Sequence, residues 1–191
     1  THGIHTYPAM MIPQIARRLI ETYGKNKEVL LDPFMGSGTA LLEAKIHKNF
    51  KKAYGIDINP LALLISKVKT TPLKAEVLKE EYHTLMTRCN EDKKSINFRE
   101  KSIAKPTFTN IEFWFKPSVI TDLAILKKNI EKVKDSDIKD FFWIAFSETV
   151  RNVSNTRNGE YKLYRKSQNT LKKHNPNTFE EFKKKVSKSI I

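Results

Sequence analysis

The hydrophobic positions of the first 72 residues alternate between helical and strand-like spacing. Apolar residues recur every three or four positions from Ile12 to Tyr23, with Pro13 suited to a first helical turn and Gly24 to a helix end. The short apolar runs that follow are typical of buried parallel strands, and helical spacing follows each of them. The predicted elements are helices over 13–23, 39–48 and from 60 onward, and strands over 28–32 and 52–58.

Beyond Pro72 the spacing predicts mainly helices. Apolar residues at helical spacing occur in four segments, and Asp137 is a plausible N-terminal cap for the third of them. Cys89 lies on the apolar face of the first segment, which predicts a buried thiol. A polar stretch over 91–110 predicts irregular structure, and the aromatic run over 111–115 predicts a short strand or a packing wedge. The four predicted helices lie near 78–89, 119–133, 138–150 and from 175 onward.

These patterns predict an α/β protein, in which a Rossmann-like unit with an incomplete sheet precedes a mostly helical region. The predicted Rossmann-like unit spans residues 1–72. Residues 73–150 form a helical region that suits target recognition or an interface with a partner. Residues 151–191 form a basic segment followed by a last helix.

Charge points toward a polyanionic partner. The chain has 35 Lys and Arg against 21 Asp and Glu, a formal net charge of +14. The excess is concentrated late, because residues 151–191 hold 11 Lys and Arg against three Asp and Glu. Nucleic acid is the usual partner of such a surface, although lysines that only solvate the surface give the same composition.

Other compositional signals narrow the class of protein. Cys89 is the single cysteine, which excludes an intrachain disulfide and a multi-cysteine zinc site. No apolar run approaches the roughly 20 residues of a membrane span, and the first residues do not read as a signal peptide. His2 and His5 are too few for a metal site, so a role in the N-terminal loop is expected. The sequence therefore predicts a cytoplasmic protein with no metal centre.

A glycine-rich loop connects the first predicted strand to the second predicted helix. It reads Asp-Pro-Phe-Met-Gly-Ser-Gly-Thr over 32–39. Glycines let a ligand approach the backbone closely, and the helix N-terminus after them offers free N–H groups. Asp57, 25 residues after Asp32, ends the second strand, where a carboxylate can accept hydrogen bonds from ribose hydroxyls.

Residue types in and around this loop discriminate among nucleotide ligands. A phosphate-binding P-loop needs Lys followed by Ser or Thr after its last glycine, but Thr39 and Ala40 follow Gly38. The dinucleotide pattern needs a third glycine where Leu41 stands. Asp32 repels a pyrophosphate and attracts an ammonium. S-adenosylmethionine has an ammonium, a carboxylate and a ribose, so it fits this loop best.

The same residues resemble a known family. The segment 32–39 matches every fixed position of the D-P-F-x-G-S-G-T motif of DNA amino-methyltransferases, which modify adenine N6 or cytosine N4. His5-Thr6-Tyr7-Pro8-Ala9 is similar to the family's upstream motif, and Gly55 to Pro60 is similar to its acidic strand end. The resemblance is firm over 2–72 and weaker over Trp114-Phe115, Phe146 to Glu148 and Ser154 to Arg157. It implies that S-adenosylmethionine is held by Tyr7, Pro8, Asp32, Phe34, Met35, Gly36, Ser37, Gly38, Thr39, Asp57, Ile58 and Asn59.

One motif of that family is missing from the sequence. Its catalytic motif is Asp, Asn or Ser, then two prolines and an aromatic residue, and it holds the amine of a flipped base. None of the eight prolines of this chain is adjacent to another. No catalytic residue is therefore assigned. We expect the chain to be a subunit of a split enzyme or a fragment, with the catalytic motif on a second chain or a missing C-terminal half.

The basic segment after residue 150 is the best candidate for nucleic-acid contacts. Basic residues interleave with Tyr161 and Tyr164, which suits phosphate binding and base stacking, although a solvated basic loop has the same composition. Two other functions stay open: an RNA guanine-N2 methyltransferase fragment, and a non-catalytic module that regulates a partner. The candidate DNA-contacting residues are Arg151, Arg157, Lys162, Arg165 and Lys166.

Overall fold

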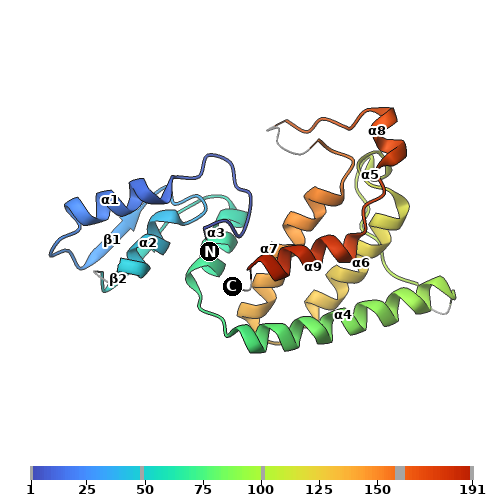
Figure 1. Ribbon diagram of the computed structural model, residues 1–191, viewed down its shortest axis with the longest axis horizontal. Coiled ribbons are helices and arrows are strands. Elements are labelled where there is room, and N and C mark those ends of the chain that lie inside the picture. The colour runs from blue at the N-terminus through green and yellow to red at the C-terminus, as the bar shows by residue number, and fades with distance from the viewer. Residues whose placement is uncertain (1, 48–49, 100–101, 158–161, 190–191) are drawn as a thin grey trace. The chain divides into compact units, whose positions relative to one another are not determined.

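The computed structural model describes residues 2–47, 50–99, 102–157 and 162–189 (Figure 1). The chain divides into two compact units, Thr1–Pro72 and Leu73–Ile191. The first is α/β and the second is helical. The segments 73–150 and 151–191 fall in the same unit, where the last helix packs against the helix that precedes the basic segment.

The first unit is a small parallel sheet with helices packed on it. In chain order it contains α1 (Pro13–Tyr23), β1 (Val29–Asp32), α2 (Thr39–His47), β2 (Lys52–Gly55) and α3 (Pro60–Thr70). The two strands pair in parallel, from Val29 opposite Lys52 to Asp32 opposite Gly55. Helix α2 packs against both strands, and α1 and α3 pack against α2. The predicted order of helices and strands is confirmed, although β2 ends three residues earlier than expected.

One face of this sheet is exposed, and neither of its two edges is paired within the described ranges. Val29, Leu31 and Tyr54 are 54%, 59% and 52% exposed. Leu31 lies opposite Tyr54 in the register, so these side chains share a face. Within the described ranges, β1 pairs with β2 alone. Because parallel sheets are normally covered on both faces, this sheet lacks part of its usual surroundings.

The second unit is an assembly of helices around an aromatic and aliphatic core. Phe142 and Phe182 are fully buried, with ring centroids 6.2 Å apart. Polar pairs join the helices as well: Asp92 accepts a hydrogen bond from Asn129 at 2.9 Å, and Lys185 donates to Glu148 at 2.9 Å. The helices of this unit are α4 (Ala75–Asn97), α5 (Ile111–Trp114), α6 (Pro117–Glu131), α7 (Ser136–Val153), α8 (Gln168–Lys173) and α9 (Thr178–Ser189).

Several local expectations for the second unit are wrong. The stretch from Glu91 to Asn97, expected to be irregular, is the last part of α4. Tertiary bonds hold it there, because Asp92 is bound by Lys128 and Asn129 of α6. Residues 111–114 form a helical turn, so the strand alternative is wrong, whereas Phe115 packs against a core cluster as the wedge alternative predicts. The cap of α7 is Asp135, whose Oδ1 accepts from the N–H groups of residues 137 and 138.

Other expectations are confirmed. Cys89 is fully buried, and burial raises the pKa of its thiol to about 12, so it stays protonated at neutral pH. The apolar spacing that predicts a helix near 138–150 is matched by burial, because Phe141 and Phe142 are core residues. None of the helices in the described part of the chain is long and apolar enough to cross a membrane.

Candidate functional site

The glycine loop turns tightly between β1 and α2. Gly36 and Gly38 have positive φ angles, +49° and +73°, which disfavour residues with a side chain. At Gly38 there is also no room, because a Cβ would lie 2.2 Å from the hydroxyl oxygen of Ser66 in α3. The amide of Met35 donates to the carbonyl of Ile56 at 3.0 Å, which fastens the loop to the end of β2.

Asp57 orders the loop from the opposite side. One of its carboxylate oxygens accepts from the Gly36 amide at 2.9 Å, and the other accepts from the Asn59 amide at 2.8 Å. The side chain is only half-buried. Each carboxylate oxygen can accept more than one hydrogen bond, so Asp57 keeps acceptor capacity for a ligand while it holds the loop.

The N-terminal segment reaches the same place. The amide nitrogen Nδ2 of Asn59 donates to the hydroxyl of Tyr7 at 3.2 Å, and the Tyr7 ring lies beside Gly36. Asn59 also caps α3 by accepting from the Leu61 amide at 3.0 Å. The structure thus brings together Tyr7, the loop, Asp57 and Asn59, which are 52 residues apart at their extremes.

Glu43 of α2 fixes that N-terminal segment. Its side chain is fully buried and accepts from Arg17 Nε at 2.9 Å, and it lies 2.8 Å from the Nε2 atom of His2. The hydrogen bond from Arg17 holds the pKa of the Glu43 carboxyl below its usual value. Sequence reasoning missed Glu43, although an acid within the apolar run of α2 was a signal. His2 has the expected role in the N-terminal segment.

The other predicted residues are arranged around the loop in different ways. Asp32 is half-buried at the end of β1, and its Oδ1 accepts from the Phe34 amide at 3.1 Å. The side chains of Phe34 and Ile58 are 90% and 100% exposed, so they point to solvent within this unit. Pro8 is also exposed, whereas the side chains that face the interior are those of Met35, Ser37 and Thr39.

Comparison with known proteins identifies the family to which this chain belongs. The sequence pattern of the DNA methylase family, which comprises N6 and N4 enzymes, matches residues 1–68. The Type II methyltransferase M.MvaI of Kocuria varians is 46% identical over the whole of this chain. The chain belongs to the DNA amino-methyltransferase family. Methyltransferases of this kind use S-adenosylmethionine, and the predicted resemblance is confirmed.

A second relative supports the same family, and both relatives are much longer. The Type II methyltransferase M.MjaII of Methanocaldococcus jannaschii is 32% identical over 77% of the chain. The chain spans 42% of M.MvaI, and its match to M.MjaII spans 28% of that protein. No solved structure matches the chain.

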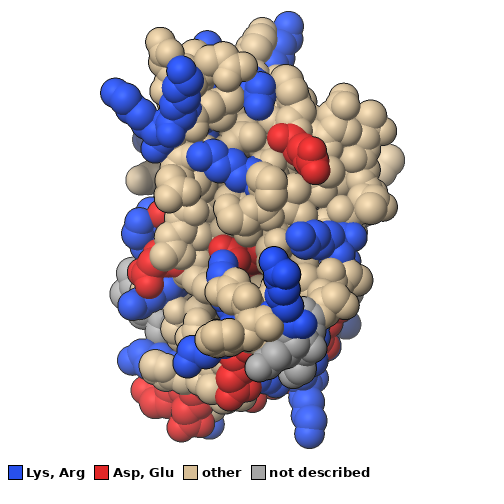
Figure 2. Space-filling view, turned by 90° about the vertical axis from the view of Figure 1, so that its right-hand side faces the viewer, with Lys and Arg blue, Asp and Glu red and all other residues tan. Residues whose placement is uncertain are grey.

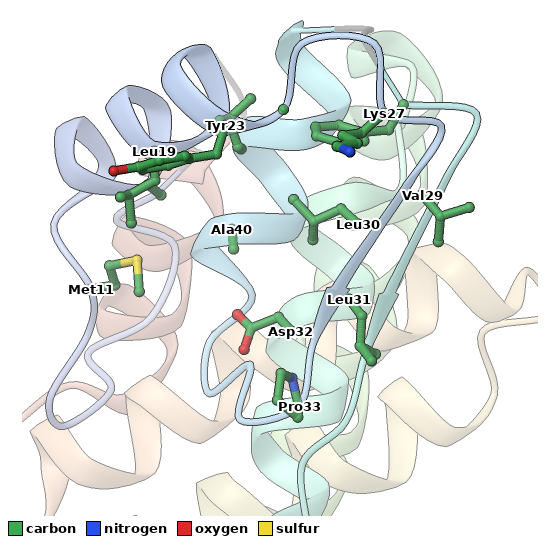
Figure 3. A pocket seen from close by; sticks show the side chains of 14 residues that line it. Met11, Leu19, Tyr23, Lys27, Val29, Leu30, Leu31, Asp32, Pro33 and Ala40 are labelled. Carbon is green, nitrogen blue, oxygen red and sulfur yellow. The ribbon is translucent and has the colours of Figure 1, made fainter.

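A cavity of about 440 Å³ opens at the edge of β1 in this family member. Figure 3 shows side chains of α1 on one side of it and those of β1 on the other. Asp32 and Pro33 contribute to its wall, but Asp57 and Gly36 do not. The cavity is therefore separate from the contacts that Asp57 makes with the loop. Most of its lining is apolar and comes from Met11, Leu19, Ile20, Tyr23, Val29, Leu30, Leu31, Ala40 and Phe50.

In the second unit the basic segment returns on itself. The amide of Arg157 donates to the carbonyl of Tyr164 at 2.8 Å, and that of Lys166 donates to the carbonyl of Asn155 at 2.8 Å. Thr156 and Arg165 form an antiparallel bridge. Tyr161 lies outside the described residues. Basic side chains gather toward the upper end of the face in Figure 2, at the level of α8 in Figure 1.

The basic side chains of this segment differ in how exposed they are. Arg165 and Lys166 are bound within the unit: Arg165 Nε donates to the Phe113 carbonyl at 3.0 Å, and Lys166 Nζ donates to the Ser154 carbonyl at 2.7 Å. Arg165 also stacks over the Phe113 ring at 4.2 Å. Arg157 and Lys162 are exposed, and Arg151 is half-buried in α7. The exposed pair is therefore better placed for an external ligand.

Within the described ranges no group of three or more His, Cys, Asp or Glu side chains is arranged to hold a metal ion. The site thus consists of hydrogen-bonding groups: the loop amides, two carboxylates, and the side chains of Tyr7 and Asn59. Lys69, which sequence reasoning also missed, lies against the loop through Ser37.

Proposed function

We propose that this chain is the S-adenosylmethionine-binding and DNA-contacting part of a DNA amino-methyltransferase that modifies adenine N6 or cytosine N4. The observation that carries the proposal is the bond between Asp57 and the Gly36 amide, which joins the acidic end of β2 to the glycine loop. Together with family membership, this arrangement favours a Rossmann-like cofactor unit. DNA as the substrate favours action in the cytoplasm.

The residues fit the chemical groups of S-adenosylmethionine. Asp57 is proposed to accept from the ribose hydroxyls and Asp32 to bind the methionyl ammonium, since a carboxylate suits each. Gly36, Ser37, Gly38 and Thr39 would contact the methionine end, with free amides at the start of α2. Tyr7, Pro8, Phe34, Met35, Ile58 and Asn59 would shape the remaining walls. The ligand supplies a methyl group on a sulfonium, and these residues bind and orient it.

The catalytic motif is proposed to lie on another polypeptide segment or chain that covers the bare side of the sheet. Three observations favour this. The Pro-Pro-aromatic motif is absent from the sequence. The β1 edge, the exposed Val29 and Leu31 and the adjoining cavity form one continuous apolar surface. The relatives are more than twice as long as the matched part.

Cofactor binding is the direct test of this function. Calorimetric titration should show one site for S-adenosylmethionine, and no binding of ATP or NAD at the same concentrations. The reason is chemical: the loop lacks the lysine of a P-loop and the third glycine of the dinucleotide motif, and Asp32 repels phosphate. Binding of ATP or NAD without S-adenosylmethionine would contradict the proposal.

DNA contact is proposed for Arg151, Arg157 and Lys162, with Arg165 and Lys166 bracing the segment from inside. The affinity for duplex DNA should fall steeply with salt, because each neutralised phosphate releases counterions. The double variant R157E/K162E should reduce the slope of log affinity against log salt by about 2, near 0.9 per lost contact. Fluorescence anisotropy over a salt series measures it.

The control for that experiment is K79E/K134E, which reverses two exposed lysines elsewhere in the second unit. It changes the net charge by the same amount, so it separates local contacts from the overall field. If the two double variants have equal slopes of log affinity against log salt, the segment is a solvated basic loop that makes no specific contact with DNA. Methyl transfer to transfer RNA instead of DNA would favour an RNA guanine methyltransferase.

A further inference from the structure

Lys69 is a buried lysine directly behind the glycine loop. It lies near the end of α3, and the residue is only 6% exposed. Its ammonium donates to the hydroxyl oxygen of Ser37 at 3.1 Å. Ser37 is the central residue of the Gly-Ser-Gly turn and is itself 3% exposed. The positive charge of Lys69 therefore lies against the glycine loop, which is the segment proposed to bind S-adenosylmethionine.

That charge has no counter-charge within the described ranges. No carboxylate there forms an ion pair with Lys69, and Ser37 is the partner recorded for its ammonium. Burial lowers the pKa of the Lys69 ammonium to about 8, with no acidic neighbour to offset the effect. An ammonium has three protons to donate, and a buried cation without an anion is unfavourable unless something else compensates it.

The carboxylates of Glu43 and Asp57, in the same unit, have other partners. Glu43 of α2 is bound by Arg17 and His2, and Asp57 is bound by the amides of Gly36 and Asn59. Lys45 is a further cation at the end of α3, where its ammonium donates to the Thr70 carbonyl. It adds positive charge to the same region. The region behind the loop therefore attracts an anion.

We propose that Lys69, acting with Ser37, recognises the α-carboxylate of S-adenosylmethionine. This inference rests on the proposed function. The carboxylate is the one anionic group of that ligand, and Asp32 and Asp57 are suited to its ammonium and ribose instead. The Ser37 oxygen that accepts from Lys69 leaves its own hydrogen free to donate, so the hydroxyl transmits the charge toward the loop surface. Lys69 is thus a positioning residue whose partner arrives with the ligand.

The alternative is that Lys69 only shapes the loop through Ser37. The two roles predict different ligand dependence. A purely structural lysine would affect every ligand of the loop equally. A lysine that recognises the carboxylate would affect only ligands that have one. Decarboxylated S-adenosylmethionine lacks that group and retains the ammonium, ribose and sulfonium, whereas S-adenosylhomocysteine retains the carboxylate and lacks the sulfonium charge.

The experiment compares Lys69→Met with Lys67→Met by calorimetry on three ligands. Lys67 lies two residues earlier in α3 and is exposed, so it is a matched control. Lys69→Met should weaken S-adenosylmethionine and S-adenosylhomocysteine by at least about tenfold, the usual effect of losing a charge-assisted hydrogen bond. Its affinity for the decarboxylated ligand should stay within about twofold of the wild type. Lys67→Met should change none of the three.

Two results would overturn the inference. Equal loss for all three ligands would show that Lys69 acts on the loop alone, and unchanged affinity for all three would show that it has no role. If Lys69→Met does not fold, Ser37→Ala provides the same comparison, with selective loss of the two carboxylate ligands expected. Failure of the wild type to bind any of the ligands would instead contradict the proposed function.

Discussion

Replacing Asp57 by alanine should weaken the binding of S-adenosylmethionine by about 2–4 kcal/mol, or roughly 30- to 700-fold. The variant loses the acceptors proposed for the ribose hydroxyls. It also frees the amides of Gly36 and Asn59, which the carboxylate holds at 2.9 and 2.8 Å, so the loop loses its order. Calorimetry with both proteins measures the difference.

The Asp57→Asn variant separates these two contributions. Its amide keeps one acceptor oxygen and nearly the same shape, so one of the two backbone contacts can remain. We expect a smaller loss of affinity than for alanine. A thermal unfolding curve for each variant shows whether the unit stays folded. Equal affinity of the wild type and Asp57→Ala would show that the assignment of Asp57 is wrong.

The fold of the first unit was predictable because its signals are local. The glycine loop, the apolar strands and the Pro-initiated helices each occupy a short stretch, and their order alone implies a strand–loop–helix–strand unit. The place of Asp57 beside the loop was predictable for the same reason, since this residue follows the second strand at a fixed distance after the loop. What could not be predicted is that Asp57 binds the Gly36 amide, because that contact depends on how the two strands pair.

Residues that act through tertiary contacts were missed. Glu43 and Lys69 are both buried, and both contact segments more than 25 residues away, which the sequence does not reveal. The polar end of α4 was predicted to be irregular for a similar reason. Its stability comes from Asp92, which contacts α6 36 and 37 residues later. The spacing of apolar residues along the sequence shows which face of a helix is apolar. It does not show which polar side chains contact one another in the fold.

The basic segment shows the same limit in another form. Its five candidate residues are equivalent by composition. In the structure, however, Arg165 and Lys166 are bound to backbone carbonyls, whereas Lys162 is exposed. Burial lowers the pKa of Lys166, which is consistent with an internal role. The number of basic residues in the sequence therefore overestimates how many of them can contact DNA. The exposure of each side chain in the structure gives the smaller number.

This chain alone should transfer no methyl group to DNA. Its residues are proposed to bind and orient the methyl donor, but the Pro-Pro-aromatic motif that would hold the target amine is absent from the sequence. Positioning of the reacting groups supplies much of the rate in such reactions, so an unpositioned amine should give no measurable product. The assay is the transfer of a tritiated methyl group to unmethylated genomic DNA.

Activity should return when a polypeptide carrying the missing motif covers the sheet. The remaining part of M.MvaI is a suitable probe, because that relative is 46% identical over the matched part. Leu31→Lys, on the bare face of β1, should abolish the rescue and leave the binding of S-adenosylmethionine intact, since a charge there opposes apolar packing. Val77→Lys, at an exposed apolar position of the second unit, is the control and should leave the rescue unchanged.

Robust incorporation of the methyl group by the chain alone, lost in Asp32→Ala, would contradict the prediction and place the catalytic groups within these 191 residues. Rescue that survives Leu31→Lys would place the docking surface elsewhere.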